Sequence, residues 1–128
     1  MAMENLSYQK IADYLQDMLP VDWSRLFFVT IFVDRSYSCK CYADLGDGTY
    51  TDCFRLPMVT KALRDTAFSG IYAELQAARA QLPEDARWSG FVMQLSSTGK
   101  FKAGFDYGSE DIPAADRIEA LREKYANA

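Results

Sequence analysis

The spacing of apolar residues predicts a helix near the start of the chain. From Asn5 to Leu19 they recur every three or four positions, which is the period of a helix that buries one face. Asn5 or Ser7 can cap its first turn by accepting hydrogen bonds from free backbone amides. The helix should end at Leu19, because a residue that precedes proline is disfavoured in the α conformation.

The same period predicts two later helices. One is irregular over Met58–Asp65 and regular over Thr66–Leu82, and Pro83 ends it. The other covers Ile112–Tyr125, where Pro113 suits the first turn because no amide is needed there. The residues expected to face inward are Phe68, Ile71, Tyr72, Leu75 and Ala78 in the first of these helices, and Ile118, Leu121 and Tyr125 in the second.

Strands are predicted between the helices, beginning with a run that is apolar on both faces. Leu26–Val33 is typical of a central strand, and a reversal at residues 34–36 leads into a second strand at Tyr37–Ala43. Asp47-Gly48 then indicates a two-residue type I′ hairpin turn, and the third strand should end at Leu56-Pro57. This turn would pair Cys41 with Phe54 and Cys39 with Leu56, and would leave Cys53 on the opposite face.

A second hairpin is predicted from Trp88–Leu95 and Phe101–Tyr107. A three-residue loop with Gly99 in the left-handed conformation would join the two strands. The residues then paired on one face are Leu95 with Phe101, Met93 with Ala103, and Phe91 with Phe105. The whole order, α-β-β-β-α-β-β-α, predicts a single α+β domain over residues 1–128, with an antiparallel sheet of about five strands and helices packed on it.

Composition excludes some functions and disfavours others. The chain has 128 residues, a net charge of −4 and no histidine, so the side chain most often used for acid–base catalysis is missing. The acidic balance disfavours direct contact with nucleic acid, whose phosphates require a basic patch. No apolar run is long enough to span a membrane, and no signal peptide is evident, so we expect a cytoplasmic protein.

The cysteines suggest reduced structural thiols. Cys39, Cys41 and Cys53 make an odd number, which fits a reducing compartment. A zinc site would need a fourth ligand, and the predicted hairpin places Cys53 away from the other two cysteines. We therefore expect no metal and no cofactor.

Acidic residues and tyrosines are the candidates for a binding surface. One acidic group surrounds the first hairpin turn and another follows the last strand, and such groups can steer a basic partner. Tyrosine adds a large contact area at a small entropic cost. The partner-binding candidates are Tyr42, Asp44, Asp47, Tyr50, Asp52, Asp106, Glu110, Asp111 and Asp116.

Motifs at both ends of the chain resemble a known family. Asp17-Met18-Leu19-Pro20 precedes Asp22 and Trp23 near the start, and Gly99-Lys100-Phe101 precedes Phe105-Asp106-Tyr107 near the end. Leu56-Pro57 before the long helix and Trp88 at the fourth strand complete an ordered set. Together these segments resemble the YezG-like immunity proteins, small bacterial proteins that neutralise a cognate toxin by binding it.

The resemblance implies an antitoxin of a polymorphic toxin system, of the kind that acts in contact-dependent inhibition. Its partner would be the C-terminal toxin domain of a large secreted protein, and such domains are often nucleases. The protein would occlude the toxin's active site or another essential surface, without catalytic activity and without contact with a membrane. The motif residues Trp23, Phe101 and Phe105 would belong to the scaffold.

Two other classes of function stay open. A small-molecule-binding or regulatory α+β domain would need a concave pocket, which the sequence does not reveal. An enzyme would need a pair of carboxylates or a partly exposed thiol of low pKa, and Cys53 is the residue to inspect for the latter.

Overall fold

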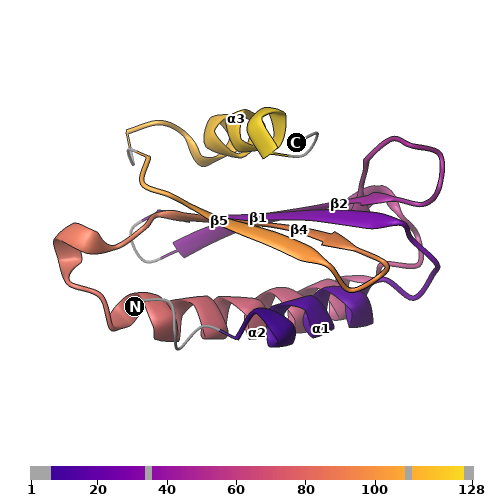
Figure 1. Ribbon diagram of the computed structural model, residues 1–128, viewed down its shortest axis with the longest axis horizontal. Coiled ribbons are helices and arrows are strands. Elements are labelled where there is room, and N and C mark those ends of the chain that lie inside the picture. The colour runs from indigo at the N-terminus through magenta and orange to yellow at the C-terminus, as the bar shows by residue number, and fades with distance from the viewer. Residues whose placement is uncertain (1–6, 34–35, 109–110, 126–128) are drawn as a thin grey trace. The chain divides into compact units, whose positions relative to one another are not determined.

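The computed structural model describes residues 7–33, 36–108 and 111–125 (Figure 1). The chain forms two compact units, a helical unit from Met1–Asp22 and Leu56–Arg87 and a sheet unit from Trp23–Arg55 and Trp88–Ala128. The elements follow the predicted order, and the sheet has five antiparallel strands, which confirms the α+β class. No helix in the described ranges combines the length and the apolar character needed to cross a bilayer.

The helical unit begins with α1 (Tyr8–Met18). Ser7 caps this helix, since its Oγ accepts a hydrogen bond from the backbone N–H of Lys10 at 3.3 Å. Asn5, the other predicted cap, lies outside the described residues. Leu19 is the C-terminal cap residue and donates its N–H to the carbonyl of Gln16, so the helix ends one residue before the predicted limit.

The second helix of this unit, α2 (Lys61–Ala80), begins earlier than the sequence indicated. Thr60 caps it, because its Oγ1 accepts from the N–H of Leu63, and the predicted irregular stretch is therefore mostly regular helix. A 3-10 turn, η2 (Glu84–Ala86), follows Pro83. The buried residues of α2 are Ala67, Phe68, Ile71, Leu75 and Ala78, while Tyr72 is only half-buried.

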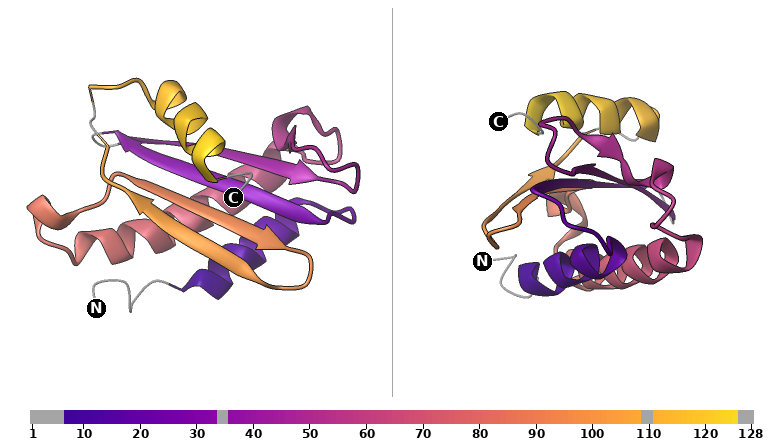
Figure 2. Two further views of the ribbon diagram at one scale, coloured as in Figure 1. Left: turned by 45° about the horizontal axis from the view of Figure 1, so that its top comes forward. Right: turned by 90° about the vertical axis from the view of Figure 1, so that its right-hand side faces the viewer.

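The two long helices of the unit lie side by side and approach closely at one glycine (Figure 2). A Cβ atom built on Gly70 of α2 would lie 2.3 Å from Cζ of Tyr14 on α1, a distance that no real contact tolerates. The absence of a side chain at Gly70 therefore makes room for the tyrosine ring. Lys10 and Glu74 add an exposed ion pair between the same helices, at 3.8 Å.

The sheet unit has the strand order β3-β2-β1-β4-β5. Its central strand β1 (Arg25–Val33) pairs with β2 (Ser36–Asp44) on one side and β4 (Gly90–Ser96) on the other. Residues Leu26 to Phe32 are all buried, as predicted for a strand with two apolar faces.

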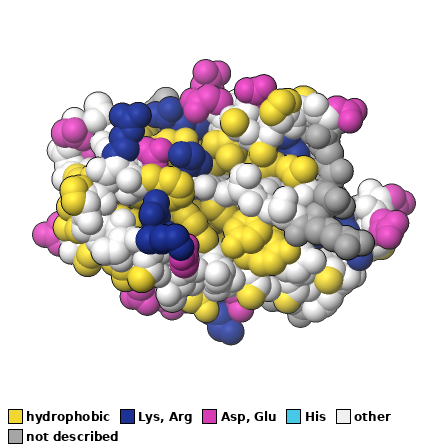
Figure 3. Space-filling model, turned by 180° about the vertical axis from the view of Figure 1, so that it is seen from behind, with side chains coloured by type: hydrophobic (Ala, Val, Ile, Leu, Met, Phe, Trp, Pro, Cys, Tyr) yellow, Lys and Arg dark blue, Asp and Glu magenta, His cyan; other side chains and the backbone are white. Residues whose placement is uncertain are grey.

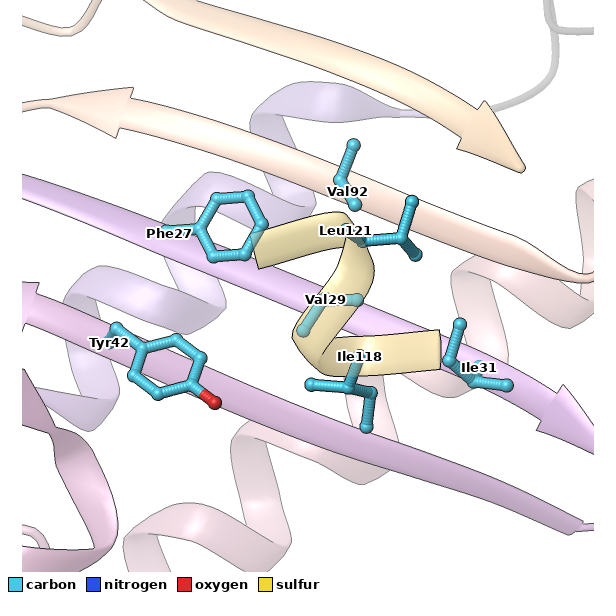
Figure 4. Packing of buried hydrophobic residues seen from close by; sticks show 7 residues of the cluster. All are labelled: Phe27, Val29, Ile31, Tyr42, Val92, Ile118 and Leu121. Carbon is cyan, nitrogen blue, oxygen red and sulfur yellow. The ribbon is translucent and has the colours of Figure 1, made fainter. Parts of the chain in front are cut away.

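Helix α3 (Ala114–Tyr125) packs on one face of this sheet (Figures 1 and 4). It starts two residues after the predicted limit, and the carbonyl of Pro113 accepts from the N–H groups of Asp116 and Arg117. Its residues Ile118 and Leu121 point at the strands, as predicted. The cluster they form contains Phe27, Val29 and Ile31 of β1, Tyr42 of β2 and Val92 of β4.

The other face of the sheet carries an aromatic cluster. Trp88, which precedes β4, is fully buried, and its ring centroid lies 5.6 Å from that of Phe32 and 5.0 Å from that of Phe105. Phe91 joins the same cluster, 5.5 Å from Phe105. These distances suit offset and edge-to-face ring packing.

The second hairpin has the predicted register. Strand β5 (Phe101–Asp106) pairs with β4 so that Leu95 lies opposite Phe101, and the other two predicted pairs follow. Gly99 has φ of 91°, which is the left-handed conformation expected of the last loop residue. The turn chemistry and the alternation of apolar residues were sufficient to predict this hairpin.

The prediction for the first hairpin was wrong. Strand β3 (Thr51–Asp52) has only two residues and pairs Tyr42 with Asp52, one residue out of the predicted register. A 3-10 turn, η1 (Cys53–Arg55), follows at once, so neither Phe54 nor Leu56 pairs with the strand. The connection from Asp44 to Thr51 is a longer loop, because the Asp44 side chain binds backbone amides inside it.

The close approach at Gly70 gives a test of packing between α1 and α2. We expect Gly70→Ala to lower the free energy of unfolding by up to about 2 kcal/mol, because overpacking costs about 1–3 kcal/mol and the better helix propensity of alanine offsets about 1 kcal/mol of it. In a Tyr14→Ala background the same change should be neutral or stabilising by up to about 1 kcal/mol, because alanine is the better helix former. Urea denaturation of the four proteins of this cycle measures both values, and an equal effect in both backgrounds would contradict the proposed contact.

Candidate partner-binding surface

The loop between β2 and β3 is organised around the carboxylate of Asp44. Its Oδ1 accepts from the N–H of Gly46 at 2.8 Å and of Gly48 at 3.1 Å, and both glycines have positive φ. Its Oδ2 accepts from Nε of Arg25 at 2.9 Å. The hydrogen bond from Gly46 and the contact with Arg25 hold the pKa of Asp44 below its ordinary value. The loop is therefore ordered by contacts within the protein itself.

Arg25 connects this loop to the start of β1. Its Nη2 donates to the carbonyl of Gly48 at 3.1 Å, and its guanidinium lies 4.5 Å from the ring centroid of Tyr50. Tyr50 is half-buried by these contacts, and burial raises the pKa of its hydroxyl. Asp47 is exposed in the same loop and accepts from the N–H of Thr49 at 3.0 Å.

A groove of about 770 Å³ opens beside this loop, within the sheet unit. Its walls come from β2, from residues 50–55 and from the side of α3 that includes the core residue Ile118. The lining residues are Ser38, Cys39, Lys40, Tyr42, Tyr50, Thr51, Asp52, Arg55, Ala115, Ile118, Glu119 and Arg122. Strand β3 pairs only with Tyr42 and Ala43, so among the described residues no strand pairs with the outer edge of β2 from Ser36 to Cys41, and the groove lies along this edge.

Charges of both signs line the groove. Lys40 Nζ lies 2.9 Å from Asp52 Oδ2, and the same ammonium lies 4.6 Å from the ring centroid of Phe54. On the opposite wall, Arg122 contacts Glu119 at 3.1 Å and stacks over Tyr42 at 4.6 Å. Lys40 and Arg122 thus each have a carboxylate and an aromatic ring as neighbours.

The mixed character of the surface extends beyond the groove. On the face of the molecule in Figure 3, basic and acidic side chains lie interspersed among hydrophobic ones, and no large area has a single sign.

The structure brings three predicted residues together at the groove, Tyr42, Tyr50 and Asp52. Tyr42 is mostly covered, with its ring 6.2 Å from that of Phe27, and burial raises its pKa. Asp47 is exposed in the neighbouring loop, whereas Asp44 is buried beneath it. The groove also contains the cationic residues Lys40, Arg55 and Arg122 and the acidic Glu119, which carry no signal in the sequence because only the fold brings α3 next to β2.

The second predicted group of carboxylates is dispersed. Asp106 forms an ion pair with the buried Arg117, since its Oδ2 lies 2.7 Å from Arg117 Nη2. Arg117 Nη2 also donates to Ser89 Oγ at 2.6 Å, and together these contacts attach α3 to the end of β5. Asp111 and Asp116 are exposed and lie outside the groove lining, and Glu110 lies outside the described residues.

The thiols are buried or nearly so. Cys53 lies beside Cys41 rather than on the opposite face of the hairpin, which corrects the predicted placement; the strand ends before Cys53 and the 3-10 turn carries it inward. A hydrogen bond between these thiols and burial raise the pKa of Cys41 well above its ordinary value. Burial raises the pKa of Cys39 to about 12. Among the described residues no three cysteine or acidic side chains are placed to bind a metal ion.

Comparison with known sequences identifies the family of this chain. A family model described as "Immunity protein YezG-like" matches residues 3–125, so the chain belongs to the YezG-like immunity protein family. One relative is "Immunity protein YezG" of Bacillus spizizenii, which is 24% identical over 116 residues. That alignment covers 85% of this chain and 70% of the relative. The resemblance inferred from the motifs is thereby confirmed.

The lowered pKa of Asp44 leads us to expect that the stability of the protein depends on pH. A carboxylate whose pKa is lower in the folded state stabilises the fold above its unfolded pKa of about 3.9, and this contribution disappears as the pH falls through the folded pKa. We expect Asp44→Asn to lower the urea midpoint at neutral pH, and the difference from the unaltered protein to shrink in acid. Asp47→Asn is the control in the same loop, and an equal loss for both variants would contradict the central role of Asp44.

The Arg117 ion pair gives a second test. Asp106→Ala leaves the Arg117 guanidinium buried without its carboxylate, and we expect the free energy of unfolding to fall by about 2–3 kcal/mol. This is less than the roughly 3–5 kcal/mol lost when a fully buried pair is broken, because Asp106 keeps some exposure. Replacing Arg117 by methionine in the Asp106→Ala protein should recover most of this loss. Thermal or urea unfolding measures both, and a double variant less stable than Asp106→Ala would refute the argument.

Proposed function

We propose that this protein is an immunity protein that binds a cognate toxin domain and protects the cell by that binding. The observation that carries the proposal is the family match, which extends over residues 3–125 and hence over both compact units. The motifs that carry the family resemblance also fall in both units, at Asp17–Trp23 and at Gly99–Tyr107. Membership therefore concerns the whole fold rather than one shared element.

The groove and the neighbouring loop are the surface that we assign to toxin recognition. Tyrosine and arginine are enriched among the residues that dominate binding energy at protein interfaces. Here Tyr50, Arg55 and Arg122 line one groove together with Lys40 and Asp52. The loop is preorganised by Asp44, so a partner would pay little entropy to order it.

We propose further that the toxin is a nuclease and that binding occludes its active site. A nuclease binds a polyanion and must therefore present a basic surface around its catalytic groups. Asp47 on the loop, and Asp116 and Glu119 on α3, are exposed carboxylates that can meet such a surface. The net charge of −4 would speed the encounter by electrostatic steering.

A small-molecule-binding role is the second candidate, and the size of the groove is what favours it. Ligand pockets commonly have volumes of about 300–1,000 Å³, and the groove falls within this range. Its lining is highly charged, however, whereas most ligand pockets are mainly apolar. The enzyme alternative has weaker support, because Cys53 is fully buried rather than partly exposed.

The test is binding to the toxin domain encoded beside this protein. We expect a stoichiometric complex on copurification, protection of cells that express the toxin, and a dissociation constant in the nanomolar range or below. Glu119→Lys removes an exposed carboxylate from the groove lining and places a positive charge opposite a basic partner, so it should weaken binding at least about tenfold, which corresponds to about 1.4 kcal/mol.

The matched control is Lys61→Glu, which reverses one exposed charge on α2 in an i,i+4 surface pair and should leave the affinity unchanged. If the two variants bind equally well, the groove is not the interface. If neither the unaltered protein nor the variants bind the toxin domain, the immunity function itself is refuted.

A further inference from the structure

The free edge of β5 is a second distinctive surface of the sheet unit. This strand ends the order β3-β2-β1-β4-β5, so no described strand pairs with its outer side. Ser96 donates its N–H to the carbonyl of Lys100 at 2.8 Å, which sets the phase of hydrogen bonding between β4 and β5. In an antiparallel pair, alternate residues direct their backbone groups away from the partner strand. By this phase Ala103 and Phe105 direct theirs to the open edge.

Side chains along this edge combine apolar and basic character. Phe101 keeps 44% of its surface exposed, although its family motif was expected to be scaffold, and Ala103 beside it is also exposed. Lys100 and Lys102 are exposed and, being two residues apart, project from the same face of the strand.

A hollow of about 590 Å³ adjoins the edge at the hairpin end. Leu26, Leu95 and Phe101 form its apolar part, and Arg25, Lys100 and Lys102 contribute the charges. The lining contains no acidic side chain, and the charge of Arg25 is already balanced by Asp44. Neither Lys100 nor Lys102 forms an ion pair within the described part of the chain, so two lysines beside an apolar hollow define the chemistry of this surface.

We propose that the β5 edge binds an extended acidic segment of a partner protein as an added strand. The backbone of Ala103 and Phe105 would supply the main-chain hydrogen bonds, as in other cases of strand addition. Carboxylates of the segment would face Lys100 and Lys102, and apolar side chains would lie beside Phe101 and Ala103. This recognition is separate from the groove and does not depend on which toxin is bound.

A second copy of the same chain is a poor occupant of this edge. Two β5 strands paired edge to edge would bring the lysines of both copies onto one face of the joined sheet, and like charges at such positions destabilise pairing. Lysine on an edge strand is a known means of preventing association between identical molecules. The same lysines therefore select for an acidic partner.

The test uses the full chain and a labelled peptide of alternating valine and glutamate, six residues long, with a valine–lysine peptide for comparison. We expect the acidic peptide to bind, to bind less tightly as salt is added, and to slow amide hydrogen exchange at Ala103 and Phe105. Fluorescence anisotropy measures the affinity and NMR measures the exchange. The lysine peptide should not bind.

Variants separate the charge from the main-chain contribution. Lys102→Glu should weaken binding at least tenfold, whereas Lys61→Glu should not. Ala103→Pro removes the outward N–H at an edge position where proline is tolerated, and Ala103→Ser is its control. Absence of binding at about 1 mM peptide, equal binding to the Lys102→Glu protein, or binding without slower exchange at Ala103 and Phe105 would each overturn the proposal.

Discussion

The two apolar faces of β1 are the constraint on which the sheet unit depends. Residues Leu26 to Phe32 are buried without interruption, so both faces of the strand must be kept from water. Helix α3 covers one face through Ile118 and Leu121, and the ion pair between Arg117 and Asp106 fixes where its first turn sits. Once α3 lies there, the side of the helix that includes Ile118, Glu119 and Arg122 forms a wall beside β2. The groove is thus a consequence of how the core is covered.

Local signals in the sequence predicted most of the fold. Short-range features marked the ends of helices, namely the N-cap residue Ser7 and the prolines at residues 20 and 83. Short-range features also predicted the second hairpin, namely Gly99 in its loop and the alternation that sets the register of β4 and β5. The first hairpin failed because its loop depends on Arg25, which is 19 residues from Asp44 in the chain. A turn dipeptide cannot reveal that a distant guanidinium and two glycine amides bind the same carboxylate together.

The candidate site was predicted only in part, for a related reason. Composition identified tyrosines and carboxylates, and three of them do meet at the groove. The charge of an acidic residue does not reveal whether its side chain faces solvent or stabilises the fold. Asp44 and Asp106 stabilise the fold, through ion pairs with Arg25 and Arg117. Lys40 and Arg122 had no local signal, since their proximity arises from the packing of α3 on the sheet.

The loop after β2 consists of a frame tied to the sheet and an exposed outer surface. The frame consists of Asp44, the glycines at 46 and 48, and Arg25, while the exposed side chains of Leu45, Asp47 and Thr49 contribute nothing to the core. Substitutions at these three outer positions can therefore accumulate without unfolding the protein. Such a loop lets recognition of one partner be replaced by recognition of another in a few steps, each of which yields a folded intermediate.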